Sequence, residues 1–243
     1  MIDTNIYLHR WPFRRLPGDD PVSLTTKLRA ARVMQAWTGS FDALLADDLA
    51  EVNTRLASDC RRFGDGLLLP FGCVNPALPD WREELRRCID QHRMRGIRLH
   101  PNYHGYTLAD AALRELLTAA AERKVLVQIA VQMQDERTQH QLVRTAPVNL
   151  APMPNVPGAR IQLLNATRPM AASNGTLPTD FAMVEGVHGL RDLAHNIGAE
   201  RILFGSFYPC FYFEAAVLKL KESGLAAAAI TTENAQRLLQ GAK

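Results

Sequence analysis

The chain has 243 residues, which is long for one average domain but within the range of the larger single-domain folds. Hydrophobic residues make up 47% and charged residues 22%, proportions that exclude a disordered or fibrous protein. The net charge is only +3 and no long basic run occurs, so we expect no nucleic acid partner.

No apolar stretch reaches the roughly 18 residues that a membrane span needs, and the first residues lack the pattern of a secretion signal. We therefore expect a cytoplasmic protein with no membrane partner. The cysteines are widely spaced and form no C-x-x-C or C-x-x-H pair; they are Cys60, Cys73, Cys88 and Cys210. This spacing favours reduced, mostly buried thiols over a zinc knuckle or disulfides.

Short apolar runs alternate with amphipathic stretches along the chain, which is typical of βα units in a parallel sheet. Eight strands are predicted, at Ile2–Tyr7, Val33–Trp37, Leu67–Val74, Gly96–His100, Val125–Val131, Ala159–Leu164, Phe181–Glu185 and Arg201–Phe204. Apolar spacing of three and four residues predicts helices that include Leu108–Ala121, Leu190–Asn196 and a last one at Glu233–Leu239.

The strand count favours an α/β fold, a single (β/α)8 TIM barrel over residues 1–243, for which about 250 residues are typical. An open sheet of six or seven strands stays an alternative, because the second strand is weak. The Pro- and Asn-rich segment Ala146–Pro157 is interpreted as a loop after the fifth strand rather than as a linker between domains.

Five segments resemble, in order and spacing, landmarks of the amidohydrolase-related family; they read IDTNIYLHRWPFR, GIRLHP, PGARIQLLNA, RILFGSFYP and ENAQRLL. In that family the first strand usually ends in D-x-H-x-H, and its two histidines bind a divalent metal. Histidines after the fifth and sixth strands and an aspartate after the eighth complete the ligands. The resemblance implies that Asn5, Tyr7, Ala130, Asn165 and Phe207 stand at these five positions here.

These five replacements predict the loss of the family's metal. Zinc prefers imidazole, thiolate or carboxylate ligands, whereas an amide oxygen is weak and Ala130 and Phe207 offer no ligand atom. We therefore expect no metal and no other cofactor. Asn5, Tyr7 and Asn165 are polar groups suited to hydrogen bonding, so we expect them to contact a substrate in a recast pocket.

Three residues at predicted strand ends are candidates for catalysis. His100 ends the fourth strand, where barrel enzymes place reactive groups, and histidine titrates near neutral pH. Arg98 lies on the same side of that strand, and Glu185 ends the seventh and can pair with either residue. A structural histidine and an arginine paired with a carboxylate such as Asp3 explain the pattern equally well.

Loops at the expected barrel mouth supply further candidates. Tyr103 lies in the polar and aromatic loop after the fourth strand, and Tyr208 follows the eighth, so both are predicted to bind substrate. The polar run Gln132–His140 offers either an acid–base pair or the first turn of a helix. His9 either lines the pocket or belongs to a loop that caps the barrel.

The resemblance implies two alternative functions. The first is a metal-independent hydrolase or lyase that acts on a small carboxylated molecule in a pocket at the C-terminal face of the barrel. The second is a non-catalytic amidohydrolase-like barrel that binds a metabolite or a protein partner. A small-molecule ligand is the expected partner, and a homo-oligomer stays open. Serine hydrolase, nucleotide hydrolase and dinucleotide-binding functions lack their usual motifs here.

Overall fold

The computed structural model describes residues 1–133 and 145–241. Its sheet has eight strands in chain order, each parallel to the next; they are β1 (Ile2–Leu8), β2 (Gln35–Ser40), β3 (Leu68–Cys73), β4 (Gly96–Leu99), β5 (Leu126–Ala130), β6 (Arg160–Leu164), β7 (Thr179–Asp180) and β8 (Ile202–Leu203). The segment after β8 closes the ring against β1, since Thr4 N–H donates to Phe204 O and Phe207 N–H donates to Asn5 O, both at 2.9 Å. The predicted (β/α)8 barrel is confirmed.

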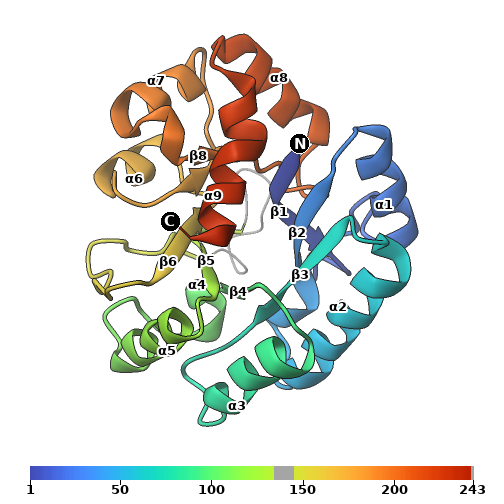
Figure 1. Ribbon diagram of the computed structural model, residues 1–243, viewed down its shortest axis with the longest axis vertical. Coiled ribbons are helices and arrows are strands. Elements are labelled where there is room, and N and C mark those ends of the chain that lie inside the picture. Colours follow the sequence, from blue (N-terminus) through green and yellow to red (C-terminus); the bar gives the residue numbers. More distant parts are fainter. Residues whose placement is uncertain (134–144, 242–243) are drawn as a thin grey trace.

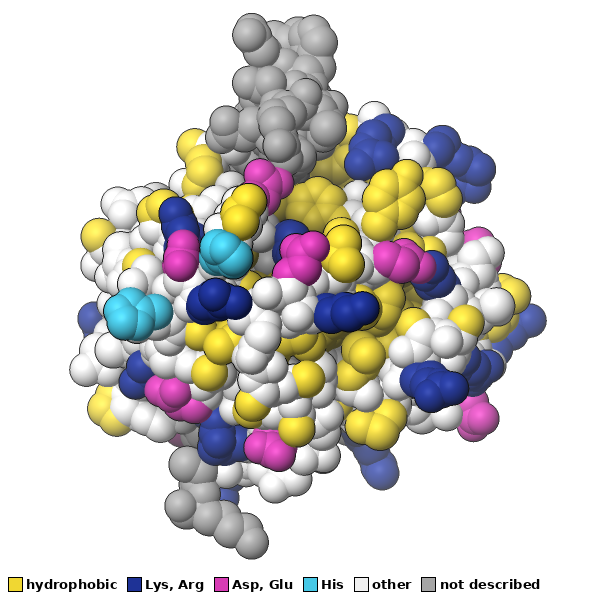
Figure 2. Space-filling view, turned by 90° about the horizontal axis from the view of Figure 1, so that it is seen from above, with side chains coloured by type: hydrophobic (Ala, Val, Ile, Leu, Met, Phe, Trp, Pro, Cys, Tyr) yellow, Lys and Arg dark blue, Asp and Glu magenta, His cyan; other side chains and the backbone are white. Residues whose placement is uncertain are grey.

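Helices surround the strands in a ring (Figure 1); they are α1 (Pro21–Ala30), α2 (Leu49–Gly64), α3 (Trp81–Arg86), α4 (Pro101–His104), α5 (Ala111–Glu122), α6 (Arg168–Ser173), α7 (Gly189–Ile197), α8 (Phe213–Ser223) and α9 (Asn234–Gln240). The carboxylates of Asp20 and Asp48 cap α1 and α2 by accepting N–H groups of the first turn. Within the described residues, no helix has the length and apolar character to span a membrane. On the face shown in Figure 2, basic and acidic side chains are interspersed.

Helix α9 covers the end of the barrel at which the strands begin, as Figure 1 shows. There Ala235, Leu238 and Leu239 of α9 pack in an apolar cluster with the strand residues Ile2, Trp37, Phe71, Leu126 and Leu203. Burying this apolar surface closes the N-terminal end. The loops that follow the strands are therefore left to form the opposite, C-terminal face, where barrel enzymes place their chemistry.

The barrel interior contains a chain of buried polar side chains instead of the branched apolar residues common there. Arg98 Nε donates to Gln128 Oε1 at 2.9 Å, Gln128 Nε2 to Gln162 Oε1 at 2.8 Å, and Gln162 Nε2 to Thr4 Oγ1 at 2.8 Å. All four side chains are 0% exposed. Each lies on a different strand, so the network joins β1, β4, β5 and β6 across the interior.

The predicted strand boundaries are wrong in two places. The second strand runs over Gln35–Ser40 instead of Val33–Trp37, because Val33 N–H still bonds to Leu28 O at the end of α1. The seventh ends at Asp180, before the predicted run Phe181–Glu185 begins. The Asp180 side chain accepts the N–H of Ala182 at 2.8 Å, and this turn takes the chain out of the sheet.

The helices predicted at Leu108–Ala121, Leu190–Asn196 and Glu233–Leu239 are confirmed as α5, α7 and α9, with shifted ends. The segment Ala146–Pro157 forms turns and irregular chain between β5 and β6, so its prediction as a loop within one barrel is confirmed.

Gly96 begins β4 at a place where a side chain has no room. A Cβ there would overlap the Phe71 ring and lie 2.8 Å from Leu126 O. We expect Gly96→Ala to destabilise the fold by about 1–3 kcal/mol, because the core cannot yield without strain. Thermal unfolding measures this as a fall in Tm of about 2–4 °C per kcal/mol.

Gly175→Ala is the matched control for this prediction. Its Cβ would meet no heavy atom closer than 3.6 Å, so its Tm should stay near that of the unaltered protein. Equal Tm values for the two variants would contradict the close packing of Gly96.

Candidate active site

The five residues at the expected metal-ligand positions lie together at the C-terminal face. Asn5 Nδ2 donates to Asn165 Oδ1 at 2.7 Å, and the rings of Tyr7 and Phe207 meet edge-on with centroids 5.8 Å apart. Ala130 belongs to the same apolar cluster as Tyr7 and Phe207. All five are 0% exposed. The structure thus brings together residues taken from β1, the ends of β5 and β6, and the turn after β8.

Asp180 is part of this cluster, although the sequence pattern did not indicate it. Its Oδ2 accepts Asn5 Nδ2 and Asn165 N–H, each at 3.0 Å, and its Oδ1 accepts Ala182 N–H. Asn165 has a φ of 60°, and its own Nδ2 donates to Gln132 O at 2.8 Å. An aspartate at the end of a strand could have been recognised in the sequence. The apolar run Phe181–Val184 that follows Asp180 instead favoured a strand that begins after it.

These groups do not fit a divalent cation at the family's usual position. The Asn5 amide directs N–H groups at Asn165 and Asp180, and Ala130 and Phe207 are apolar. Asn5 Oδ1 has no hydrogen-bond partner among the described residues, but a lone amide oxygen is a weak ligand for a transition metal. The two oxygens of Asp180 already accept three N–H groups. Hydrogen bonds therefore occupy most of the polar atoms that these residues offer.

Asp3 is a second buried carboxyl beside this cluster. Its Oδ1 accepts the N–H groups of Asn5 at 3.0 Å and Ser206 at 3.1 Å, whereas its Oδ2 is buried without a hydrogen-bond partner among the described residues. Burial raises the pKa of Asp3 to about 7 and that of Asp180 to about 6, and each group is fully buried. Both carboxyls thus change protonation state close to neutral pH.

His100 contacts Tyr7 at the end of β4. Its Nε2 lies 3.0 Å from Tyr7 Oη, and Tyr7 Oη donates to Met133 Sδ at 3.3 Å. Burial lowers the pKa of His100 well below its ordinary value, so the imidazole is neutral at neutral pH. At 1% exposure, His100 lies beneath the surface instead of lining an open pocket.

An aromatic layer covers Tyr7 from the side of the barrel mouth. Phe41 stacks on the Tyr7 ring at a centroid distance of 4.6 Å, and Trp11 packs edge-on against Phe41 at 5.2 Å. Phe41 is 1% and Trp11 4% exposed. This layer separates the Tyr7–His100 pair from the loops above it.

The alternative in which Arg98 pairs with a carboxylate such as Asp3 is not among the contacts of the described residues. Arg98 instead donates to the carbonyls of Ile6 at 2.9 Å and Trp37 at 3.0 Å, besides Gln128. Its guanidinium carbon also lies 4.4 Å from the centre of the Tyr7 ring. Arg98 thus joins neighbouring strands from within the barrel.

Glu185 does not end the seventh strand, and the structure does not bring it together with Arg98 and His100. It is exposed in the loop before α7, where its charge acts on Lys219. The expected pairing across the barrel is therefore corrected, because the turn at Asp180 directs the chain outward before Glu185 is reached.

Tyr103 and Tyr208, the two loop tyrosines predicted to bind substrate, have different neighbours. Tyr103 is half-buried at the mouth, with its ring 6.5 Å from that of Phe13, and burial raises its pKa to about 12. Tyr208 lies against Gly18, in the loop before α1, and not in the Asn5 cluster. Of the polar run Gln132–His140, residues 134–140 lie outside the described residues.

His9 is held by contacts with its neighbours. Its Nδ1 lies 2.7 Å from Ser40 Oγ and its Nε2 3.1 Å from Asp59 Oδ2. These bonds tie the loop after β1 to β2 and α2, which supports the interpretation of a capping loop.

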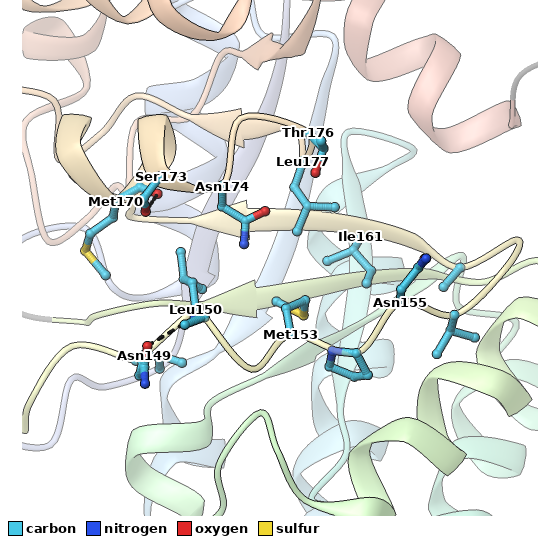
Figure 3. Close-up of a pocket in the computed structure, with 15 residues that line it drawn as sticks. Asn149, Leu150, Met153, Asn155, Ile161, Met170, Ser173, Asn174, Thr176 and Leu177 are labelled. Carbon is cyan, nitrogen blue, oxygen red and sulfur yellow. Dashed lines mark hydrogen bonds between the residues drawn. The ribbon is translucent and has the colours of Figure 1, made fainter.

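Two grooves lie at different places on the barrel surface. One of about 560 Å³ lies at the mouth between the loop after β1 and the turn after β2, and is lined by Arg10, Trp11, Phe13, Arg14, Arg15 and Phe41 among others. A larger one of about 770 Å³ lies outside the barrel between the chain before β6 and helix α6. Figure 3 shows Leu150, Met153, Ile161 and Leu177 around this outer groove. Only the first groove adjoins the aromatic layer.

Comparison with known proteins gives a consistent result. The amidohydrolase family model matches residues 3–241, whereas no curated protein matches. A 2,6-dihydroxybenzoate decarboxylase from Rhizobium has a similar structure, with a TM-score of 0.71, 13% identity, and 98% of this chain and 97% of that chain covered.

Two further solved structures are also similar. One is a putative 2-pyrone-4,6-dicarboxylic acid hydrolase from Pseudomonas putida, with a TM-score of 0.67, 20% identity and coverage of 98% and 97% of the two chains. The other is a 5-carboxyvanillate decarboxylase from Sphingomonas paucimobilis, with a TM-score of 0.69, 12% identity and coverage of 98% of both. At these identities the structures support the fold. The match of the family model over nearly the whole chain shows that this protein belongs to the amidohydrolase family.

Proposed function

We propose that this protein is a hydrolase or lyase that acts on a small carboxylated molecule at the C-terminal face of the barrel, without a metal at the family's usual position. One observation carries the proposal: two fully buried carboxyls, Asp3 near the start of β1 and Asp180 at the end of β7, flank Asn5, and burial raises their pKa to about 7 and about 6. Groups that titrate near the working pH are suited to proton transfer, and such shifts concentrate at functional sites.

The mouth groove supports a carboxylated substrate. Arg10, Arg14 and Arg15 line it and are exposed, and Trp11 and Phe13 supply aromatic surface. A guanidinium group matches a carboxylate with two parallel hydrogen bonds, and aromatic rings suit a planar substrate. The similar structures are named for 2,6-dihydroxybenzoate, 5-carboxyvanillate and a pyrone dicarboxylic acid, each a carboxylated compound.

In the proposed reaction, Asp180 transfers a proton to or from the substrate. Burial raises its pKa to about 6, so the protonated and ionised carboxyl are both available near neutral pH. Asn5 and Asn165 hold its carboxylate in place through their N–H groups. The charge of Arg98 opposes the effect of burial on the pKa of Asp180. Asp180 is 0% exposed, so a substrate reaches it only when side chains at the barrel mouth move aside, a gating step of a common kind.

The other catalytic and binding roles expected from the sequence stay predictions. His100 is neutral and beneath the aromatic layer, and Glu185 receives no step in this proposal. Tyr103 lies close enough to Phe13 to contact a ligand in the mouth groove.

A panel of aromatic carboxylates and lactone dicarboxylates tests the enzyme proposal. We expect turnover that falls by about 100-fold or more in Asp180→Asn, since general acid–base catalysis contributes at least this much. Asp192→Asn, an exposed carboxylate of α7, is the control and should leave kcat unchanged. Arg14→Ala should raise KM more than it lowers kcat.

Turnover should also persist after metal is removed with a chelator. Loss of turnover on this treatment would contradict the metal-independent mechanism.

A non-catalytic carboxylate-binding barrel is the second candidate, favoured by the burial of Tyr7 and His100 beneath the aromatic layer. It predicts binding of the same carboxylates without turnover. Calorimetric titration distinguishes the two, because binding that Arg14→Ala weakens, with no product formed at high protein concentration, would support this candidate and exclude the enzyme.

A further inference from the structure

Three side chains with metal-binding atoms converge beside the aromatic layer, outside the family's five ligand positions. Cys73 ends β3, His100 follows β4, and His104 ends the single turn of α4. The sulfur and one nitrogen from each imidazole lie within 4.8 Å of one another. Cys73 and His100 are 3% and 1% exposed, and Cys73 Sγ lies 3.5 Å from His100 Nδ1.

The hydrogen bond of His104 leaves one of its nitrogens free to bind a metal. Its Nε2 lies 2.9 Å from Ala43 O, and a carbonyl only accepts, so Nε2 carries the proton. Nδ1 therefore keeps a lone pair. This atom is buried and has no hydrogen-bond partner among the described residues, which is a costly state for a buried acceptor.

His100 likewise keeps one ring nitrogen free to bind a metal. Tyr7 Oη donates its proton to Met133 Sδ, so it can accept the Nε2 proton of His100. His100 Nδ1 then presents a lone pair to Cys73 Sγ. Two imidazole lone pairs thus face one thiol, and the single S–H proton can satisfy only one of them.

We infer that Cys73, His100 and His104 bind one zinc ion through Sγ and the two Nδ1 atoms. A thiolate and two neutral imidazoles are a preferred set for Zn²⁺, with Zn–S of about 2.3 Å and Zn–N of about 2.0–2.1 Å. In tetrahedral geometry these lengths place S and N about 3.5 Å apart, the separation already present between Cys73 and His100. A fourth position is left for water or a small ligand.

The surroundings of the three ligands have the features of a zinc site. Each imidazole is oriented by a hydrogen bond from its other nitrogen, His100 through Tyr7 and His104 through Ala43, as is usual for histidine ligands. Asn53 holds the backbone of Cys73 by accepting its N–H at 2.7 Å and donating to its carbonyl at 2.8 Å. The inference concerns zinc binding alone and does not depend on the proposed reaction.

Cobalt titration of the metal-free protein tests the site. We expect one Co²⁺ per chain, a thiolate-to-metal charge-transfer band, and displacement by one equivalent of Zn²⁺. Cys73→Ala should remove the band, and His104→Gln should weaken Co²⁺ binding by at least about tenfold. Cys60→Ala, a buried cysteine in α2, and His92→Gln are matched controls that should bind as the unaltered protein does.

The readouts are independent of turnover, so a failure of the enzyme proposal leaves this test intact. Circular dichroism verifies that each variant is folded. The partly exposed His104 provides a second variant if Cys73→Ala does not fold. Absence of the charge-transfer band at one equivalent of Co²⁺, or unchanged Zn²⁺ affinity in His104→Gln, would overturn the inference.

Discussion

Arg98→Met is expected to lower the free energy of unfolding by about 3–5 kcal/mol, because several buried acceptors lose their hydrogen-bond donor at once. The guanidinium group donates to Ile6 O, Trp37 O and Gln128 Oε1, and all these contacts are buried. Methionine fills similar volume but leaves the three acceptors without donors, each at a cost of about 1–3 kcal/mol before relaxation. The variant also removes the positive charge that acts on Asp180.

Urea unfolding followed by circular dichroism measures this loss. Arg95→Met is the matched control, because Arg95 lies one residue before β4 and is exposed, so its stability should change by less than about 0.5 kcal/mol. Arg98→Lys should recover only part of the loss, since an ammonium group cannot reproduce the planar fork. A loss below about 1 kcal/mol in Arg98→Met would show that the network contributes little to stability.

The second large effect is a fall in stability as pH rises toward neutrality and beyond. Burial raises the pKa of Asp3 from 3.8 to about 7. The folded chain therefore holds a proton that the unfolded chain releases between these values. The resulting stabilisation is complete below about pH 4 and is lost as pH rises through about 7. At about 1.4 kcal/mol per pKa unit, the effect is on the order of a few kcal/mol.

Asp3→Asn isolates this contribution. The amide oxygen can still accept the N–H groups of Asn5 and Ser206, but the group no longer titrates. We expect the variant to lose much of the stability difference between pH 5 and pH 8 and to equal or exceed the unaltered protein at pH 8. His100 and His104 have lowered pKa values and act in the opposite direction below about pH 6.5 in both proteins, so they cancel in the comparison.

Exposed Asp80 supplies the control, since Asp80→Asn should leave the pH profile of stability unchanged. Parallel profiles for Asp3→Asn and the unaltered protein would contradict the raised pKa of Asp3.

Elements with a continuous apolar pattern were predictable because local burial alone determines them. β5 and β6 lie within the predicted runs, and α7 follows the three- and four-residue spacing of Leu190, Leu193 and Ile197. β7 was misplaced because the run Phe181–Val184 is as buried as a strand. The turn made by the Asp180 side chain outweighs this local preference.

The candidate site was predictable only in part. Motif spacing was enough to predict that Asn5, Tyr7 and Asn165 lie together at the C-terminal face of the barrel, because the ends of parallel strands meet there. Motif spacing did not indicate that Arg98 lies inside the barrel and donates hydrogen bonds to other strands. The carbonyls of Ile6 and Trp37 come close to Arg98 only once β1, β2 and β4 have assembled.

The (β/α)8 barrel was predictable from the sequence alone, because the periodicity of its strands and helices is a local property of the chain. Only the tertiary structure decided that Asp180 joins Asn5, and that Cys73 meets His100 from a position 27 residues earlier in the chain. No spacing motif links residues on neighbouring strands. Their distance, burial and hydrogen-bond partners depend on the closure of the barrel, which the whole chain must complete.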